Sequence, residues 1–150
     1  MDKTVLSESE KAVIQSLLSD FKLVRSNKLS IHESYLLFLG TLFYFFSQKF
    51  LFKRNSDLKN FVNNTLLDYL KKDVPYKNYL FSSRYNFISR VQKDIITNLG
   101  YQDIVNLSLF LEELITKSFP ISKESKKGTN NKISPIDFIS EWSHFIRNNK

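Results

Sequence analysis

The spacing of apolar residues along the chain predicts an all-α protein of about six helices. Residues 7–26 and 30–53 form the first two, because each opens with a serine followed three positions later by a glutamate, the pattern of a capping box. A third helix is expected from about residue 55, where apolar positions again recur at helical spacing. It ends by Val74, since Pro75 disfavours a helical conformation in the residue before it.

Two further helices are expected in the middle of the chain. The fourth covers residues 82–99 and is followed by Gly100, a residue type that favours the position just past a helix C-terminus. The fifth covers residues 102–117 and is apolar on most sides.

The last part of the chain contains one polar break and the sixth predicted helix. Residues 119–133 are polar and rich in lysine, and this composition predicts a flexible loop. The sixth helix opens with Ser134 as N-cap and Pro135 in its first turn. Its apolar stripe includes Trp142 and Phe145.

The second predicted helix is the most apolar segment of the chain. It is uncharged only from Ser34 to Gln48, which is shorter than the roughly 20 residues that a membrane-spanning helix needs. A helix that is apolar in nearly every direction is buried inside a protein. We therefore expect the other helices to pack around this central, Phe-rich one, with the fifth helix as the second candidate for a central position.

Length and composition indicate one helical domain in a reducing compartment. The 150 residues fit a single domain, residues 1–150, and three glycines and three prolines are few for a turn-rich β architecture. The chain has no cysteine, and residues 1–13 lack the apolar region of a signal peptide, so a cytoplasmic location is expected. The formal net charge of +7 is compatible with an acidic partner.

No motif for catalysis or metal binding occurs in the sequence. Gly-rich phosphate loops, nucleophile elbows and zinc-protease motifs are absent. The two histidines, His32 and His144, do not lie at metal-ligand spacing. Glu112 and Glu113 are adjacent and point about 100° apart on a helix, so they are expected at a solvated edge and not around one substrate. We expect neither an enzyme nor a metal site.

Basic residues offer one candidate contact for a ligand. Arg84 lies on the apolar stripe of the fourth helix, one turn before Ile88. There its guanidinium could bind a buried carboxylate, or its aliphatic part could line the core edge while the charge reaches solvent. No predicted helix carries the basic stripe of a DNA-recognition helix. A nucleic acid could therefore bind only through non-specific attraction to the lysine-rich loop.

Three segments resemble the haemless globin-type sensor domains: LLFLGTLFYFF at 36–46, RYNFISRVQKDI at 84–95 and PIDFISEWSHF at 135–145. In particular, the chain resembles free-standing sporulation-inhibitory proteins related to the sensor domain of a sporulation histidine kinase. The resemblance implies a globin-like fold, a homodimer, a fatty acid in the apolar interior and an effect on a signalling kinase. A haem globin needs a proximal histidine in mid-domain, and the only histidines lie near the two ends, so no haem is expected.

Three hypotheses for function follow. The first is a stand-alone sensor that binds an apolar carboxylate such as a fatty acid, with Arg84 on the carboxylate and five residues lining the pocket: Phe38, Leu42, Phe45, Tyr85 and Ile88. The second is a protein-interaction or immunity factor with a solid core and no ligand. The third is a basic helical regulator that binds nucleic acid.

A homodimer is also expected from the distribution of apolar residues. The second and fifth helices have more apolar directions than the flanking helices of one small domain can cover, and a two-fold contact is the commonest way to hide such a surface. The expected contacts are Leu109 of the fifth helix and Trp142 and Phe145 of the sixth.

Overall fold

The structure is a computed structural model, and it describes residues 6–119. Within this range the chain forms five α-helices, one π-helix and one 3-10 helix, and no β-strand. The elements follow in this order: α1 (Glu8–Val24), α2 (Ile31–Ser47), α3 (Asn55–Phe61), the π-helix η1 (Val62–Leu66), the 3-10 helix η2 (Asn78–Ser82), α4 (Arg84–Asn98) and α5 (Tyr101–Ser118).

The all-α prediction is confirmed for these residues. The predicted lysine-rich loop, apart from Phe119, and the predicted sixth helix lie outside the described residues, and so do Trp142 and Phe145. The fifth predicted helix, over residues 102–117, agrees with α5 to within one residue at each end.

Both predicted capping boxes are present. The Ser7 hydroxyl accepts the backbone N–H of Glu10 at 3.1 Å, and the Glu10 carboxylate accepts the N–H of Ser7 at 2.9 Å. Ser30 and Glu33 make the same pair of bonds at the start of α2. Each box satisfies N–H groups that have no partner inside the helix, so both helices begin where the sequence predicts.

The prediction that the second helix extends to residue 53 was wrong, because α2 ends at Ser47. Gln48 leaves the helical conformation, and its carbonyl accepts the N–H groups of Leu51 at 3.1 Å and Phe52 at 3.0 Å in a tight turn. Leu51 and Phe52 are both buried. The turn brings these two side chains into the core, and their burial offsets the helical hydrogen bonds that are lost.

The third and fourth predicted helices are also shorter than expected. In place of one helix over residues 55–74, α3 passes into η1, and Lys71 further on has a left-handed backbone with φ 60°. The fourth helix starts at Arg84 and not at residue 82, because the Ser83 hydroxyl caps it by accepting the N–H of Asn86 at 3.3 Å. Gly100 follows α4 as expected, but its backbone is extended and it serves as the N-cap of α5.

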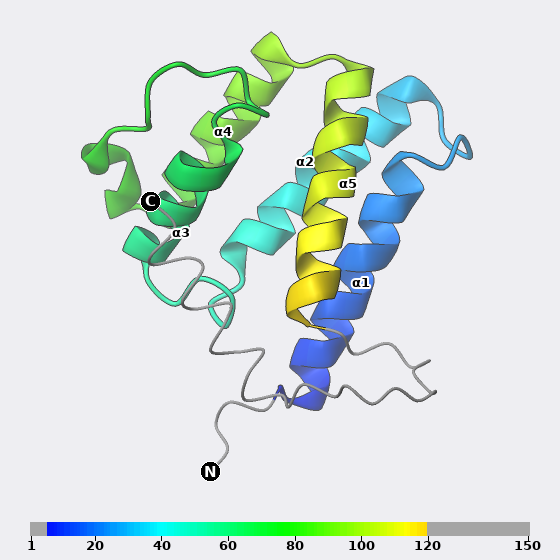
Figure 1. Cartoon of the computed structure of the whole chain (residues 1–150), viewed down its shortest axis with the longest axis horizontal. Helices are drawn as coiled ribbons and strands as arrows, with labels where there is room; N and C mark the ends of the chain where they lie inside the picture. Colours follow the sequence, from blue (N-terminus) through cyan, green and yellow to red (C-terminus); the bar gives the residue numbers. More distant parts are fainter. Residues whose placement is uncertain (1–5, 120–150) are drawn as a thin grey trace.

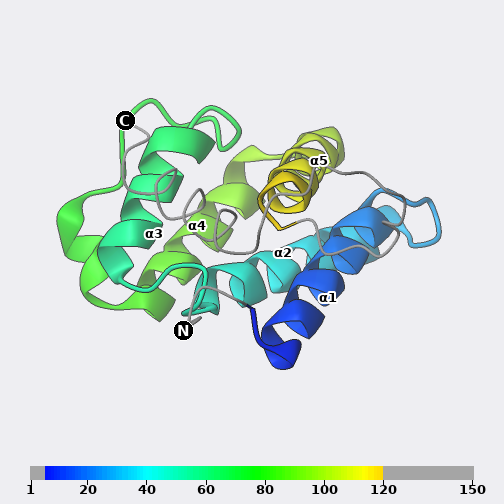
Figure 2. The ribbon, with the colours of Figure 1, turned by 60° about the horizontal axis from the view of Figure 1, so that its bottom comes forward.

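The helices pack around α2, which contacts α1, α4 and α5. In Figure 1, α5 crosses on the near side of α2, and α1 lies beside α5. Figure 2 shows α2 between the pair α1 and α5 and the pair α3 and α4. The prediction of a central second helix therefore agrees with this arrangement, although the exposed Leu36 and Phe43 show that part of α2 stays uncovered.

Phenylalanine side chains from four helices and one turn meet in the core. Phe45 of α2 lies at their centre, with its ring centroid 5.3–6.3 Å from four other phenylalanine rings. These rings belong to α1, to α2, to the turn after α2 and to α3, and α4 adds another ring beside Phe46. Among residues 6–119, seven phenylalanines are fully buried: Phe21, Phe38, Phe45, Phe46, Phe52, Phe61 and Phe87.

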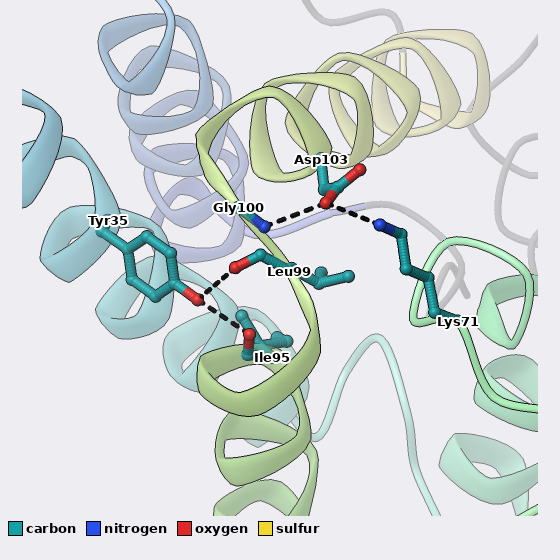
Figure 3. A network of polar contacts seen from close by, with 6 residues as sticks. All are labelled: Tyr35, Lys71, Ile95, Leu99, Gly100 and Asp103. Carbon is teal, nitrogen blue, oxygen red and sulfur yellow. Dashed lines mark hydrogen bonds and ion pairs between the residues drawn. The ribbon is translucent and has the colours of Figure 1, made fainter.

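A polar network holds the corner between α4 and α5 (Figure 3). The Tyr35 hydroxyl of α2 shares its proton between the carbonyls of Ile95 at 2.7 Å and Leu99 at 2.8 Å. The Asp103 carboxylate accepts the N–H of Gly100 at 2.9 Å and the Lys71 ammonium at 3.0 Å. Both bonds hold the pKa of Asp103 below its ordinary value, and the bond from the Gly100 backbone N–H has the larger effect.

The Asp103 bonds lead to a prediction about acid stability. A carboxyl whose pKa is lower in the folded state stabilises the fold above its unfolded pKa, and that contribution is lost as the pH falls through the folded pKa. Asp103→Asn is expected to lower the free energy of unfolding by about 0.5–1 kcal/mol at pH 7. Urea titrations at neutral and strongly acidic pH will show whether the deficit disappears in acid. An equal deficit at both pH values contradicts the role of the charge.

Candidate functional site

The apolar residues predicted to line a ligand pocket are part of the hydrophobic core. Phe38, Leu42, Phe45 and Ile88 are fully buried and belong to one continuous cluster of core side chains. Tyr85 is not with them, because its side chain is 59% exposed and its ring stacks on Phe43 at 5.7 Å on the outside of the bundle. The structure thus brings four of these five residues together and places the fifth on the surface.

Arg84 is buried, as its place on the apolar stripe indicates, and its guanidinium is bound by the protein itself. Its Nε donates to Asn55 Oδ1 at 3.0 Å, and its Nη1 donates to the carbonyl of Phe46 at 3.3 Å. Its Nη2 donates to the carbonyl of Phe52. Burial lowers the pKa of Arg84 from its ordinary value, while the charges of Tyr85 and Asp57 act in the opposite direction.

The position of these acceptors gives Arg84 a structural role. Phe46 lies in the last turn of α2, where carbonyls lack partners inside the helix, and Phe52 lies in the turn that follows. The Arg84 guanidinium at the start of α4 therefore binds three other parts of the chain: the end of α2, the turn that follows it and the start of α3. The same bonds use each nitrogen of the guanidinium, the group that the ligand hypothesis assigns to a carboxylate.

A surface hollow of about 470 Å³ lies where α1 and α5 meet, and its lining includes Arg25, Leu109 and Glu113. Glu112 also lines it, and the expectation that Glu112 would be solvated was wrong. Its carboxylate is buried and pairs with Arg25 at 2.5 Å and with Lys22 at 3.4 Å. The paired charges fix the contact between α1 and α5, since both partners of Glu112 come from the C-terminal end of α1.

An exposed apolar surface runs along the boundary between α2 and α4. Phe43 stacks on Tyr85, and the Gln92 amide donates to the carbonyl of Leu39 at 2.9 Å, so the two helices run side by side in opposite directions. Leu36 is 55% exposed and Ile96 is 60% exposed. We call this surface the α2–α4 face and define it by eight residues: Leu36, Leu39, Gly40 and Phe43 of α2, and Tyr85, Ser89, Gln92 and Ile96 of α4.

The α2–α4 face carries no charge, although the chain has a formal charge of +7. Gly40 lies in its middle, in the interior of α2, where glycine costs roughly 0.5–1 kcal/mol relative to alanine. A Cβ atom added at Gly40 would meet no atom within 4 Å. Packing inside the described domain therefore does not require this glycine, and its effect is to leave the backbone of α2 open to a close approach.

Other classes of site find no support in the part of the chain that the structure describes. Within residues 6–119, no group of three or more His, Asp or Glu side chains could hold a metal ion. No helix in this range is both long enough and apolar enough to span a membrane. Comparisons of the chain with protein-family models, with curated proteins and with solved structures found no match.

The sequence contains a signal for the α2–α4 face that a search for motifs misses. Tyr85, Ser89, Gln92 and Ile96 recur at intervals of four, three and four residues, so they form one uncharged edge of α4. The uncharged stretch of α2 supplies the other edge. The sequence does not predict that these two edges lie side by side, because this depends on how α4 packs against α2.

Proposed function

We propose that this chain is a non-enzymatic helical interaction module that binds an apolar helix of another protein on the α2–α4 face. The observation that supports it is the combination of exposed leucine, isoleucine and aromatic side chains among the eight uncharged residues that define this face. Exposed apolar patches of this kind mark interaction sites in soluble proteins. A helix laid along the face would contact side chains of α2 and α4 at helical spacing, as in other groove-binding complexes.

Substitutions of two exposed leucines test this proposal. Leu36→Lys places a charge in the α2–α4 face and is expected to lower the amount of a discrete co-purifying protein about tenfold, the effect of losing one buried leucine contact. Leu109→Lys is the matched control, because Leu109 is also an exposed leucine in mid-helix, on α5. Quantitative mass spectrometry of proteins cross-linked to the tagged chain in its source cells gives the measurement.

The two variants also distinguish the proposed face from the dimer surface expected from the sequence. If Leu109→Lys loses the partner and Leu36→Lys keeps it, the interaction lies at α5 and the proposal is wrong. Light scattering of the purified parent protein reports a homodimer directly, as about twice the 17.7 kDa chain mass.

A sensor of an apolar carboxylate is the second candidate function, with the regulation of a signalling kinase that the globin-type resemblance implies. The buried Arg84 guanidinium favours it, since it is a buried cation that binds the carbonyls of two core residues, Phe46 and Phe52. A ligand carboxylate would have to displace these two carbonyls. Native mass spectrometry of protein purified from cells tests this candidate. A bare chain mass, with no lipid released on denaturation, counts against it.

A further inference from the structure

Two segments of the described domain carry many basic residues and almost no acidic ones. Residues 34–67 contain one carboxylate, Asp57, and residues 74–93 contain none. Asp57 is buried, and its carboxylate accepts the backbone N–H of Arg54 at 3.1 Å. Arg54 Nε lies 3.8 Å from the same carboxylate, but the Arg54 side chain is 61% exposed. The lysines of both segments are exposed or partly exposed, so positive charge dominates the surface of these two segments.

Hydrogen bonds hold the two segments together at the start of α3. Asn55 Nδ2 donates to the carbonyl of Phe81 at 2.8 Å, and one turn further along α3 the Lys59 ammonium donates to Asn78 Oδ1 at 3.1 Å. The basic pair at 53–54 directly precedes the first of these contacts. Figure 2 shows α3, and the chain between α3 and α4, on the opposite side of the bundle from α1. The fold therefore places basic residues from separate parts of the chain on one surface.

An exposed tyrosine belongs to the same surface. Tyr79 directly follows Asn78, and its side chain is 69% exposed. The Ser82 hydroxyl donates to the Tyr79 carbonyl at 3.1 Å, and the bond between Lys59 and Asn78 holds the start of η2. The backbone of Tyr79 is thus fixed while most of its ring stays accessible, which gives the surface a flat aromatic group beside several cations.

We call this region the α3–η2 surface and define it by six residues: Lys53, Arg54, Lys59, Lys77, Asn78 and Tyr79. Lysine and arginine bind phosphate groups, and an aromatic ring stacks on the base of an unpaired strand. A surface that binds lipid needs several apolar side chains beside its lysines. Within residues 49–59 and 77–83, Tyr79 is the only exposed large hydrophobic residue, so the surface suits a nucleic acid better than a membrane.

We propose that the α3–η2 surface binds single-stranded nucleic acid, with the Tyr79 ring stacked on a base and the exposed cations of the surface on neighbouring phosphates. A single strand fits because its bases are free to stack, whereas a duplex groove is read by a helix with a basic stripe. The surface lies in the described domain, apart from the lysine-rich loop to which the sequence alone limits such binding. It shares no residue with the α2–α4 face and does not rest on the proposed function.

Substitutions of Tyr79 test the stacking contact. Fluorescence anisotropy measures binding of the full-length chain to labelled oligothymidylate and oligouridylate of about 20 nucleotides, longer than the site of a typical single-strand binding domain. Tyr79→Ala is expected to lower the affinity about tenfold, the effect of losing one stacked base. Tyr79→Phe is the matched control, because it keeps the ring, and we expect it to retain the affinity of the parent chain. Circular dichroism shows that both variants stay folded, as expected at an exposed position.

A pair of lysine substitutions tests the phosphate contacts. Lys53→Gln combined with Lys77→Gln is expected to lower the affinity about tenfold at low salt. It should also reduce the slope of log affinity against log salt by about 1.4, since each phosphate contact of a single strand contributes about 0.7. The control combines Lys28→Gln and Lys117→Gln, which change the net charge equally at exposed positions next to α1 and on α5. We expect this control pair to retain most of the binding.

Three results overturn the proposal. The first is no binding of the parent chain to either single strand at low salt. The second is an affinity that Tyr79→Ala leaves unchanged, or an equal loss for the two lysine pairs, because either assigns the binding to overall positive charge. The third is Tyr79-dependent sedimentation with vesicles that contain phosphatidylserine, without Tyr79-dependent binding to the single strands. That third result identifies the α3–η2 surface as a membrane contact.

Discussion

Replacing Arg84 by alanine is expected to lower the free energy of unfolding by about 3 kcal/mol, because the substitution removes a charged donor from three buried hydrogen bonds. The carbonyls of Phe46 and Phe52 and the side chain of Asn55 lose their bonds to the guanidinium together. The end of α2 and the turn after it then lose their connection to α4. Urea denaturation monitored by circular dichroism gives the measurement.

Two further variants make this result specific. Arg90→Ala removes an exposed arginine of the same helix, and a change within about 0.5 kcal/mol is expected there. Arg84→Lys keeps the charge, but an ammonium group cannot reproduce the planar fork of donors, so we expect it to restore only part of the stability. A cost for Arg84→Ala no larger than that for Arg90→Ala would show that the guanidinium does not hold the end of α2.

Replacing Phe45 by alanine is expected to cost about 3–5 kcal/mol, the range for removing a fully buried aromatic side chain. Its ring is surrounded by four others, with centroid distances of 5.3 Å to Phe52, 5.5 Å to Phe46, 6.0 Å to Phe61 and 6.3 Å to Phe21. The cavity would open where three helices and the turn meet, so no single side chain can fill it. Such a loss is a large part of the total stability of a small domain.

Phe43→Ala is the matched control for Phe45→Ala, since it lies two positions away on α2 but is 40% exposed. It loses only its stacking on Tyr85, and about 1 kcal/mol or less is expected. If Phe45→Ala prevents folding, Phe45→Leu leaves a smaller cavity and allows the denaturation to be measured. Equal losses for Phe43→Ala and Phe45→Ala would contradict the central position of the Phe45 ring.

Local features of the fold were predictable because their causes lie within a few residues. Ser7 and Ser30 each bind the third residue that follows them, so the starts of α1 and α2 follow from the sequence alone. Pro75 set only an outer limit for the third helix, because α3 and η1 end at Leu66, before the proline. The end of α2 is different, because the apolar residues from Phe50 to Phe52 are equally compatible with a longer helix and with a turn that buries them.

The candidate site shows the same division between local and long-range causes. The stripe that contains Ile88 predicts that Arg84 is near the core, and the side chain is 7% exposed. Its binding partners are Asn55 and two carbonyls that are distant in sequence, and no local pattern identifies them. Tyr85 was assigned to the same pocket although adjacent residues on a helix point about 100° apart, and it lies on the surface.

By itself, the sequence determined the all-helical class of the described residues, the start of the first two helices and the limits of α5, because capping bonds and apolar periodicity act over short distances. Only the tertiary structure decided where α2 ends, what Arg84 binds and which side of α2 remains exposed. The physical reason is that α2 is apolar on nearly every side, so its own residues do not distinguish a buried side from a free one. The packing of α1, α4 and α5 makes that distinction and leaves Leu36, Gly40 and Phe43 uncovered.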